Sequence, residues 1–202
     1  MNKKVIFHLA RHGQTEWNIE HRIQGQLDSS LTQEGKLQAL QLALSCRSLN
    51  ITKILTSPLG RAVETAEICA KELQLNIKKI IGFEERYFGC WQGKLTSEVK
   101  SHNDYTEITS QITDCKPELG ESAVELLVRF ETALKKELGC LDNIAESHCY
   151  LIIIHGDILR CFMASLMQQQ EQQKKSMTGY DYKNGAIVSV LYDPISEVFS
   201  SL

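Results

Sequence analysis

Two strongly apolar segments of the chain, residues 5–10 and 150–154, are each followed within two residues by a His-Gly pair. Both have the length and composition of strands buried on two faces, apart from His8 in the first. Amphipathic helical patterns separate them, and strands alternating with helices predict a three-layer α/β/α sandwich with a mostly parallel central sheet. If the two strands are parallel neighbours, His12 and His155 emerge at one edge of that sheet, where such folds bind ligands.

The remaining patterns complete one predicted domain of 202 residues. Further strands are expected at 51–57 and 185–192, and helices at 31–49, 57–73, 120–138 and 158–167. In the first helix we expect Thr32 to cap the start and Leu37, Leu40 and Leu44 to form the buried stripe. In the third helix the expected buried stripe is Ala123, Leu126, Leu127, Phe130 and Leu134. A polar segment at about 95–120 is expected to form a small, largely helical, cap-like insertion over the strand C-terminal ends.

The second of these helices places an arginine in its first turn. Ser57 is expected as its N-cap and Pro58 as its first helical residue. A cation in the first turn, such as Arg61, is disfavoured by about 0.3–1 kcal/mol. Two interpretations stay open: an exposed arginine that reaches Glu64 or water, or an arginine that binds an anion together with the helix N-terminus. Arg11 poses the same question, because a guanidinium at the end of a buried strand needs an anionic partner.

Two arginines, two histidines and a helix start at one sheet edge favour phosphate as the ligand. Phosphoryl transfer needs fixed donors on the phosphoryl oxygens and a nucleophile in line with the leaving oxygen. A neutral imidazole is able to be that nucleophile and to form a covalent phosphohistidine. The leaving oxygen then needs a proton donor, and the segment "FEERYFG" offers Glu84 and Glu85.

Six sequence blocks, taken in order, resemble the signature of the histidine phosphatase superfamily, in its phosphoglycerate mutase-like branch. The blocks are "LARHGQTEWN", "RIQGQLDSSLTQEGKLQA", "SPLGRAVETA", "EERYFGCWQG", "GES" and "HGD". The resemblance covers nearly the whole chain. R-H-G alone is a weak signal, whereas six blocks in the right order are very specific.

The resemblance implies a role for each matched position. His12 corresponds to the nucleophile that becomes phosphorylated, and Glu85 to the acid that protonates the leaving group and then activates water. Glu84 matches no catalytic position. The residues that would hold the phosphoryl oxygens are Arg11, Arg61 and His155. The implied substrate-binding positions are Asn18, Gln24, Gly25 and Gly156.

The chain departs from the family pattern around its second histidine. Many relatives have a small hydroxyl residue before it and two glycines after it, whereas this chain has Ile154 and then Asp157. A lost hydroxyl weakens a hydrogen bond to the site. Asp157 is expected either to orient His155 or to cap the following helix, and in both cases to modulate activity rather than abolish it.

Three function classes remain. "RIQGQLD" and "GCWQG" are similar to the phosphatase members, and a short chain leaves less material to exclude water from a phosphohistidine, so we expect a hydrolase of small phosphate monoesters. A cofactor-dependent phosphoglycerate mutase and a weakly active phosphate-binding module are the alternatives. Phosphoglycerates, sugar phosphates, nucleotides and α-ribazole phosphate stay open as substrates, and residues 95–120 and 168–180 are expected to shape the choice.

Charge and composition exclude several partners. The formal net charge is −3, and Lys and Arg are scattered rather than clustered, so neither nucleic acid nor a membrane is expected as a partner. No run approaches the roughly 20 apolar residues of a membrane span, and no secretory signal pattern is expected at the N-terminus.

The cysteines favour a cytoplasmic location. The chain has seven, an odd number, without a C-x-x-C pair. Cys69, Cys149 and Cys161 fall in apolar segments, where a free thiol behaves as a small hydrophobe. A reducing compartment is the simplest explanation.

No cofactor and no metal are expected. A metal site built from His8, His12, His155 and Asp157 would need both His8 and His12 on one ion, yet residues four apart on a strand are separated by roughly 13 Å. We expect His8 to be a core residue with its own hydrogen-bond partner. A homodimer stays open.

Overall fold

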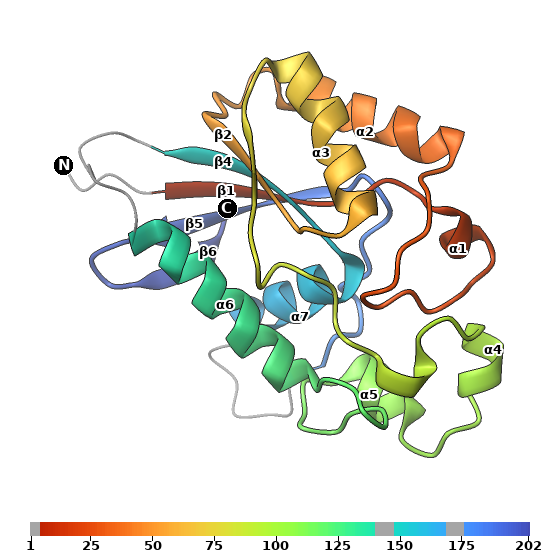
Figure 1. The fold of residues 1–202 in the computed structure, drawn as a ribbon. Coiled ribbons are helices and arrows are strands. Elements are labelled where there is room, and N and C mark those ends of the chain that lie inside the picture. Colours follow the sequence, from red (N-terminus) through yellow and green to blue (C-terminus); the bar gives the residue numbers. More distant parts are fainter. Residues whose placement is uncertain (1–4, 140–147, 169–175) are drawn as a thin grey trace.

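The computed structural model describes residues 5–139, 148–168 and 176–202. Its centre is a six-stranded sheet with the order β3-β2-β4-β1-β5-β6 (Figure 1). The strands are β1 (Val5–Arg11), β2 (Lys53–Thr56), β3 (Ile77–Lys79), β4 (Cys149–Ile154), β5 (Ile187–Asp193) and β6 (Val198–Ser201). The first four sheet positions run parallel, whereas β5 and β6 are antiparallel to their neighbours.

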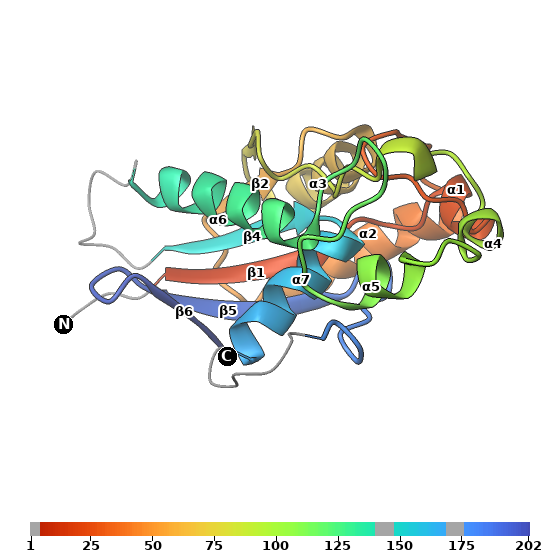
Figure 2. The ribbon, with the colours of Figure 1, turned by 90° about the horizontal axis from the view of Figure 1, so that it is seen from below.

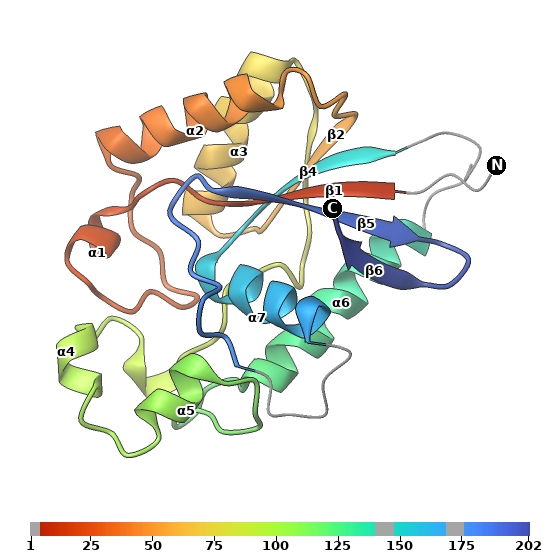
Figure 3. The ribbon, with the colours of Figure 1, turned by 180° about the vertical axis from the view of Figure 1, so that it is seen from behind.

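Helices cover both faces of the sheet, which confirms the three-layer sandwich. Helices α2 (Gln33–Cys46) and α3 (Gly60–Leu73) lie on one face, and α6 (Ala123–Gly139) and α7 (Gly156–Met167) on the other (Figures 1 and 3). Strand β4 packs against both helical layers, because its side chains point alternately to the two faces of the sheet. Leu151 and Ile153 belong to the core under α2 and α3, and Ile152 and Ile154 to the core under α6 and α7.

The prediction for α6 is confirmed, and that for α2 is wrong. The five residues of the predicted α6 stripe are all buried. Leu37, Leu40 and Leu44 of α2, by contrast, are between 38% and 54% exposed. The buried face of α2 consists instead of small residues together with Leu42, namely Gly35, Ala39, Ala43 and Cys46. Small side chains let α3 approach closely, so that the Cys69 thiol lies 3.4 Å from the Ala39 carbonyl oxygen, and the bulky leucines face away.

The start of α3 also differs from the prediction. The helix begins at Gly60, and its N-cap residue, Leu59, makes no side-chain capping bond. The carboxylate of Asp28, from a distant loop, accepts hydrogen bonds from the backbone N–H groups of Gly60 and Arg61. Asp28 therefore caps the helix in place of Ser57, whose hydroxyl contacts Nε2 of His155.

A layer of short helices lies beyond the C-terminal ends of β1 and β4 (Figures 1 and 2). It consists of α1 (Glu16–Ile19), the 3₁₀ helix Gly89–Trp91, α4 (Thr96–Val99) and α5 (Tyr105–Ser110). Trp91, Val99 and Ile108 form a small core of their own. The insertion expected at 95–120 thus consists of two short helices joined by turns, with an apolar centre that fixes it over the sheet edge.

Smaller expectations have mixed outcomes. His8 is buried, and its Nδ1 atom lies 2.8 Å from the Ser189 hydroxyl, which confirms it as a satisfied core residue. The three cysteines expected in the core are buried and free. The short strands β3 and β6 were not predicted. Part of the 168–180 segment, residues 169–175, lies outside the described residues. Among the helices of the described residues, none has the length and hydropathy needed to cross a membrane.

Candidate active site

A cavity of about 350 Å³ opens beyond the C-terminal ends of β1 and β4. The residues singled out in the sequence that line it are Arg11, His12, Asn18, Gln24, Gly25, Arg61, Glu85 and Gly156. His155 lies directly behind, with its ring centroid 5.2 Å from that of His12. The parallel register that pairs Arg11 with Ile154 brings the two histidines together. The structure therefore gathers every predicted site residue in one place.

His12 lines this cavity, and both of its ring nitrogens have hydrogen-bond partners in the protein. Its Nδ1–H donates to the carbonyl oxygen of Gly13 at 2.7 Å, so the Nε2 atom carries the lone pair. The Nε–H group of Arg61 points at that lone pair across 3.3 Å. Burial lowers the pKa of His12 well below its ordinary value, and the charges of Arg61 and Arg11 lower it further. The imidazole is thus neutral and able to act as a nucleophile at neutral pH.

Close backbone packing holds the His12 loop. A Cβ atom on Gly13 would lie 2.3 Å from the carbonyl oxygen of Gly35 at the start of α2, so only glycine fits. The Gly13 N–H donates to the Thr65 hydroxyl at 3.1 Å, and the Asn184 amide donates to the His12 carbonyl at 3.0 Å. Three separate segments therefore fix the position of the imidazole.

Arg61 is 2% exposed and fully engaged. It pairs with Asp28 at 2.9 Å and donates to the carbonyl oxygens of Leu27 and Gly25, each at 2.7 Å. The interpretation as an exposed side chain that reaches Glu64 is wrong. The buried guanidinium is instead held rigidly with its Nε–H directed at His12.

Three buried polar atoms at the site have no partner in the described part of the protein; the third is Nε of Arg160, and two lie next to His12. One is Nε of Arg11, whose Nη1 donates to the Tyr182 carbonyl at 2.7 Å. The other is Nδ1 of His155, whose Nε2 lies 2.7 Å from the Ser57 hydroxyl. Buried polar atoms without partners are costly unless a ligand satisfies them, and Nδ1 of His155 is a donor in the tautomer in which Nε2 accepts from Ser57. Together with Arg61 they form a set of donors suited to an anion with several oxygens.

Glu85 lines the cavity beside the start of α7, just after the end of β4, and is only 8% exposed. Its carboxylate accepts from the backbone N–H groups of Asp157 at 3.0 Å, Ile158 at 3.2 Å and Arg86 at 2.9 Å. Burial raises the pKa of Glu85, and the charge of Asp157 raises it further, against the opposing effect of these hydrogen bonds and of Arg61. Glu85 therefore keeps its proton to a higher pH than an ordinary glutamate, as a general acid must.

The predicted substrate-binding residues differ in what they offer. The Asn18 carbonyl oxygen accepts from the Thr15 N–H and from Asn184, which leaves its NH₂ group for the cavity. Both ends of the Gln24 amide are hydrogen-bonded within the protein. Gly25 has a φ of 55° and turns its carbonyl to Arg61. Gln24 and Gly25 thus shape the wall.

Asp157 does neither of the things expected of it. The first-turn N–H groups of α7 are taken by Glu85, so Asp157 does not cap the helix, and Ser57 holds the His155 ring. The Asp157 carboxylate pairs instead with Arg86 at 3.4 Å and Arg160 at 2.7 Å.

The sequence reading missed several residues of the cavity wall. They are Arg22, Ile23, Phe88, Thr96, Tyr105, Thr109, Arg160, Asp181 and Tyr182. One signal was present, because Arg160 follows Asp157 by one helical turn and the two form an (i, i+3) pair. The other residues lie on loops and short helices whose placement depends on tertiary packing.

Across the described ranges, no three His, Cys, Asp or Glu side chains converge in a way that suits a metal ion. The expectation that the protein needs neither metal nor cofactor stays a prediction.

Comparison with known proteins identifies the family. The family model "Histidine phosphatase superfamily (branch 1)" matches residues 7–201. A probable phosphoglycerate mutase GpmB of Escherichia fergusonii is 35% identical over 164 residues, which cover 79% of this chain and 74% of the relative. The corresponding protein of Salmonella typhi is 34% identical over 162 residues with the same coverage.

Solved structures agree in fold. The structure of Bacillus stearothermophilus YhfR superposes with a TM-score of 0.83 at 26% identity, covering 98% of this chain and 95% of the other. A mycobacterial glucosyl-3-phosphoglycerate phosphatase, solved with VO3, gives a TM-score of 0.78 at 22% identity and covers 93% and 92% of the two chains. The fold, the family model and the relatives lead to one conclusion: the chain belongs to the histidine phosphatase superfamily, an enzyme family with phosphatase and mutase members.

Proposed function

We propose that this protein is a phosphatase that hydrolyses small phosphate monoesters through a covalent phosphohistidine on His12. One observation carries the proposal: the neutral imidazole of His12 lines a cavity bordered by Arg11 and Arg61, and its Nε2 atom accepts a hydrogen bond from Arg61. Fixed cationic donors of this kind stabilise the charge that develops on phosphoryl oxygens during transfer.

In the first step, the Nε2 atom of His12 attacks phosphorus, and an N–P bond forms as the P–O bond to the leaving group breaks. The leaving oxygen takes the proton from Glu85, so that an alcohol departs rather than an alkoxide. The unpaired donors of Arg11 and His155 and the Nε–H of Arg61 bind the phosphoryl oxygens. The raised pKa of Glu85 supports its protonated starting state.

In the second step, the Glu85 carboxylate takes a proton from water, and the water oxygen attacks phosphorus. The N–P bond breaks with its electron pair returning to Nε2 of His12, and inorganic phosphate leaves. Glu85 ends protonated and His12 neutral, so both residues return to their initial states.

The cavity supports a compact substrate. Its volume of about 350 Å³ is near the lower end of the usual range for small-molecule sites. Names among the similar proteins include a putative α-ribazole-5'-P phosphatase and a glucosyl-3-phosphoglycerate phosphatase, which differ in substrate. A panel of phosphoglycerates, sugar phosphates, nucleotides and α-ribazole phosphate, ranked by kcat/KM, identifies the preferred ester.

The test is phosphate release from an aryl phosphate in the presence of EDTA. Wild-type protein is expected to turn over, and His12→Gln to lose at least about 10³-fold in kcat. Absence of turnover, or a strict requirement for added metal, contradicts the proposal.

A phosphoglycerate mutase is the second candidate, since the curated relatives at 34–35% identity are named probable phosphoglycerate mutases. The mutase reaction interconverts phosphoglycerates and is stimulated by the bisphosphorylated compound, without net phosphate release. Following both products in one reaction distinguishes the two functions.

A further inference from the structure

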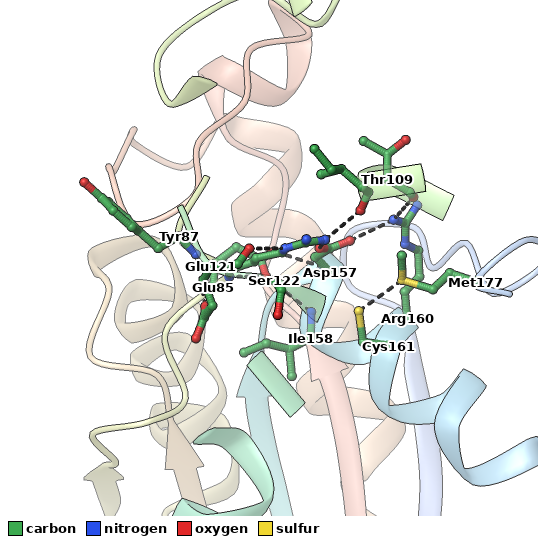
Figure 4. Close-up of polar contacts among 12 residues, drawn as sticks. Glu85, Tyr87, Thr109, Glu121, Ser122, Asp157, Ile158, Arg160, Cys161 and Met177 are labelled. Carbon is green, nitrogen blue, oxygen red and sulfur yellow. Dashed lines mark hydrogen bonds and ion pairs between the residues drawn. The ribbon is translucent and has the colours of Figure 1, made fainter. Parts of the chain in front are cut away.

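Asp157 is a buried carboxylate at the active site that no step of the proposed reaction uses. It is 9% exposed and lines the cavity beside Glu85. Its own backbone N–H donates to Oε2 of Glu85 at 3.0 Å, so the two acidic residues are linked directly (Figure 4). Burying a second carboxylate next to the general acid is costly. Its position therefore needs an explanation.

Two arginines hold the Asp157 carboxylate in place. Oδ1 pairs with Nη2 of Arg160 at 2.7 Å (Figure 4). Oδ2 pairs with Nη1 of Arg86 at 3.4 Å. Arg86 is fully buried, and its other bonds go to the carbonyl oxygens of Glu121, Ile108 and Cys115. The longer contact to Asp157 is thus one of several bonds that Arg86 makes, and Arg160 is the closer cation.

The charges around Glu85 come from several elements. Those on other elements are Arg11 at the end of β1, Arg61 on α3, Arg129 on α6, and Asp157 with the Cys161 thiol on α7. The three arginines favour an ionised Glu85. Two further carboxylates nearby, Glu84 and Glu121, are each paired with Arg129. Among these described groups, the Asp157 carboxylate is the negative charge that opposes the arginines, while the Asp157 backbone N–H itself favours the ionised form of Glu85.

We propose that Asp157 is a positioning residue whose charge keeps Glu85 protonated, as the proton donor, against the field of the phosphate-binding arginines. The inference rests on the proposed function, in which Glu85 donates a proton to the leaving group. A site that binds a phosphate dianion needs cations, and the same cations tend to strip the proton from a neighbouring acid. A fixed carboxylate beside that acid resolves the conflict.

Arg160 sets how strongly this charge acts. Besides Asp157, it donates to the Thr109 carbonyl at 2.7 Å in α5 and pairs with Asp181 at 3.3 Å. Removal of Arg160 leaves Asp157 less neutralised. The two substitutions Asp157→Asn and Arg160→Gln should therefore change the acidity of Glu85 in opposite directions.

A direct test is carbon-13 NMR of protein labelled at the glutamate side-chain carboxyl. The Glu85 signal is assigned by its loss in Glu85→Gln. In Asp157→Asn the titration midpoint of Glu85 is expected to fall by about one pH unit relative to wild type, and in Arg160→Gln to rise. Asp114→Asn, the same charge change at an exposed position of the insertion, is the matched control and should not move it.

The corresponding kinetic test measures how kcat/KM for an alkyl phosphate, whose leaving group requires a proton, depends on pH. The basic limb of this profile is the fall in kcat/KM at high pH. Asp157→Asn should move that limb to lower pH by a similar amount, and Arg160→Gln to higher pH. A fall in rate at all pH values, with the limb and the NMR midpoint unmoved, overturns the inference and indicates a merely structural role. If Asp157→Asn does not fold, the direction in which Arg160→Gln moves the Glu85 titration midpoint decides.

The two proposals fail separately. The NMR titration reports on Asp157 and Glu85 whether or not the protein turns over phosphate esters. If the protein does not hydrolyse phosphate esters but Asp157→Asn still shifts the Glu85 midpoint, the charge effect of Asp157 stands and the proposed function fails. If the protein hydrolyses the esters and the midpoint does not shift, only the inference about Asp157 fails.

Discussion

The Nε2 atom of His12 lies 3.3 Å from the Nε atom of Arg61, in a donor–acceptor contact between two buried side chains. A cation in this position keeps the imidazole neutral and occupies the lone pair that the reaction needs. In the proposed reaction this N–H has to pass from Nε2 to a phosphoryl oxygen before the imidazole attacks.

The first prediction concerns the geometry of Arg61. Arg61→Lys keeps the charge but is unable to supply donors to Asp28, two carbonyls and the phosphoryl group at once. We expect the inhibition constant for inorganic phosphate to rise about ten-fold and the free energy of unfolding to fall by about 1–3 kcal/mol. Arg47→Lys at an exposed ion pair is the control. Unchanged phosphate inhibition contradicts the assigned role.

The second prediction concerns the leaving group. Glu85→Gln removes the proton donor, so kcat for alkyl phosphates should fall by about 10²–10⁴-fold, and less for an aryl phosphate whose leaving group needs no proton. Glu84→Gln, one residue away and bound to Arg129, should leave both rates near wild type. Equal losses for both ester types would show that Glu85 acts in some other way.

A third prediction links pH to stability. Burial lowers the pKa of both His12 and His155 well below the ordinary value. As pH falls below about 6.5, the unfolded chain takes up protons at these sites before the folded protein does, so the free energy of unfolding decreases. Each histidine contributes about 1.4 kcal/mol per pH unit in that window. Glu85, with its raised pKa, is protonated first in the folded state and opposes the decrease.

Urea unfolding between pH 5 and pH 7 checks this linkage. The quantity compared is the slope of the free energy of unfolding against pH. In His155→Gln this slope should be smaller than in wild type by the equivalent of about one proton, and in Glu85→Gln it should be steeper. The same slope in wild type and His155→Gln would mean that the buried histidine is not held neutral.

The fourth prediction concerns the packing beneath His12. A Cβ atom on Gly35 would lie 2.1 Å from the carbonyl oxygen of Gln14, in the loop that carries the imidazole. Gly35→Ala should lower the free energy of unfolding by about 1–3 kcal/mol and reduce kcat as the loop shifts. Gln41→Ala on the exposed face of α2 serves as the control. A fully active, fully stable Gly35→Ala protein would contradict the proposed constraint.

The sequence was sufficient to predict where the two histidines meet. Apolar runs mark β1 and β4 as doubly buried strands, and parallel neighbours deliver His12 and His155 to the same edge. The stripe of α6 followed from helical spacing alone. In α2 the same rule failed, because Ala39 and Ala43 face a closely packed helix while larger leucines face solvent.

The partners of Arg61 and Arg86 were beyond sequence reasoning. Asp28 lies 33 residues from Arg61 in the chain and contacts it only because a loop folds over the start of α3. Arg86 reaches Asp157 from a loop 71 residues away in the chain, whereas the Arg160 contact lies within α7 and follows from helical spacing. The contacts of Arg61 and Arg86 depend on how irregular segments pack, which periodicity does not encode.

Trapping of the phosphoenzyme tests the central claim most directly. Wild-type protein mixed with substrate and quenched in alkali should carry one phosphoryl group, stable to alkali and labile to acid, on the peptide that contains His12. His12→Gln should carry none and should not turn over. A phosphoryl group on any other residue, or undiminished turnover by His12→Gln, would contradict the account.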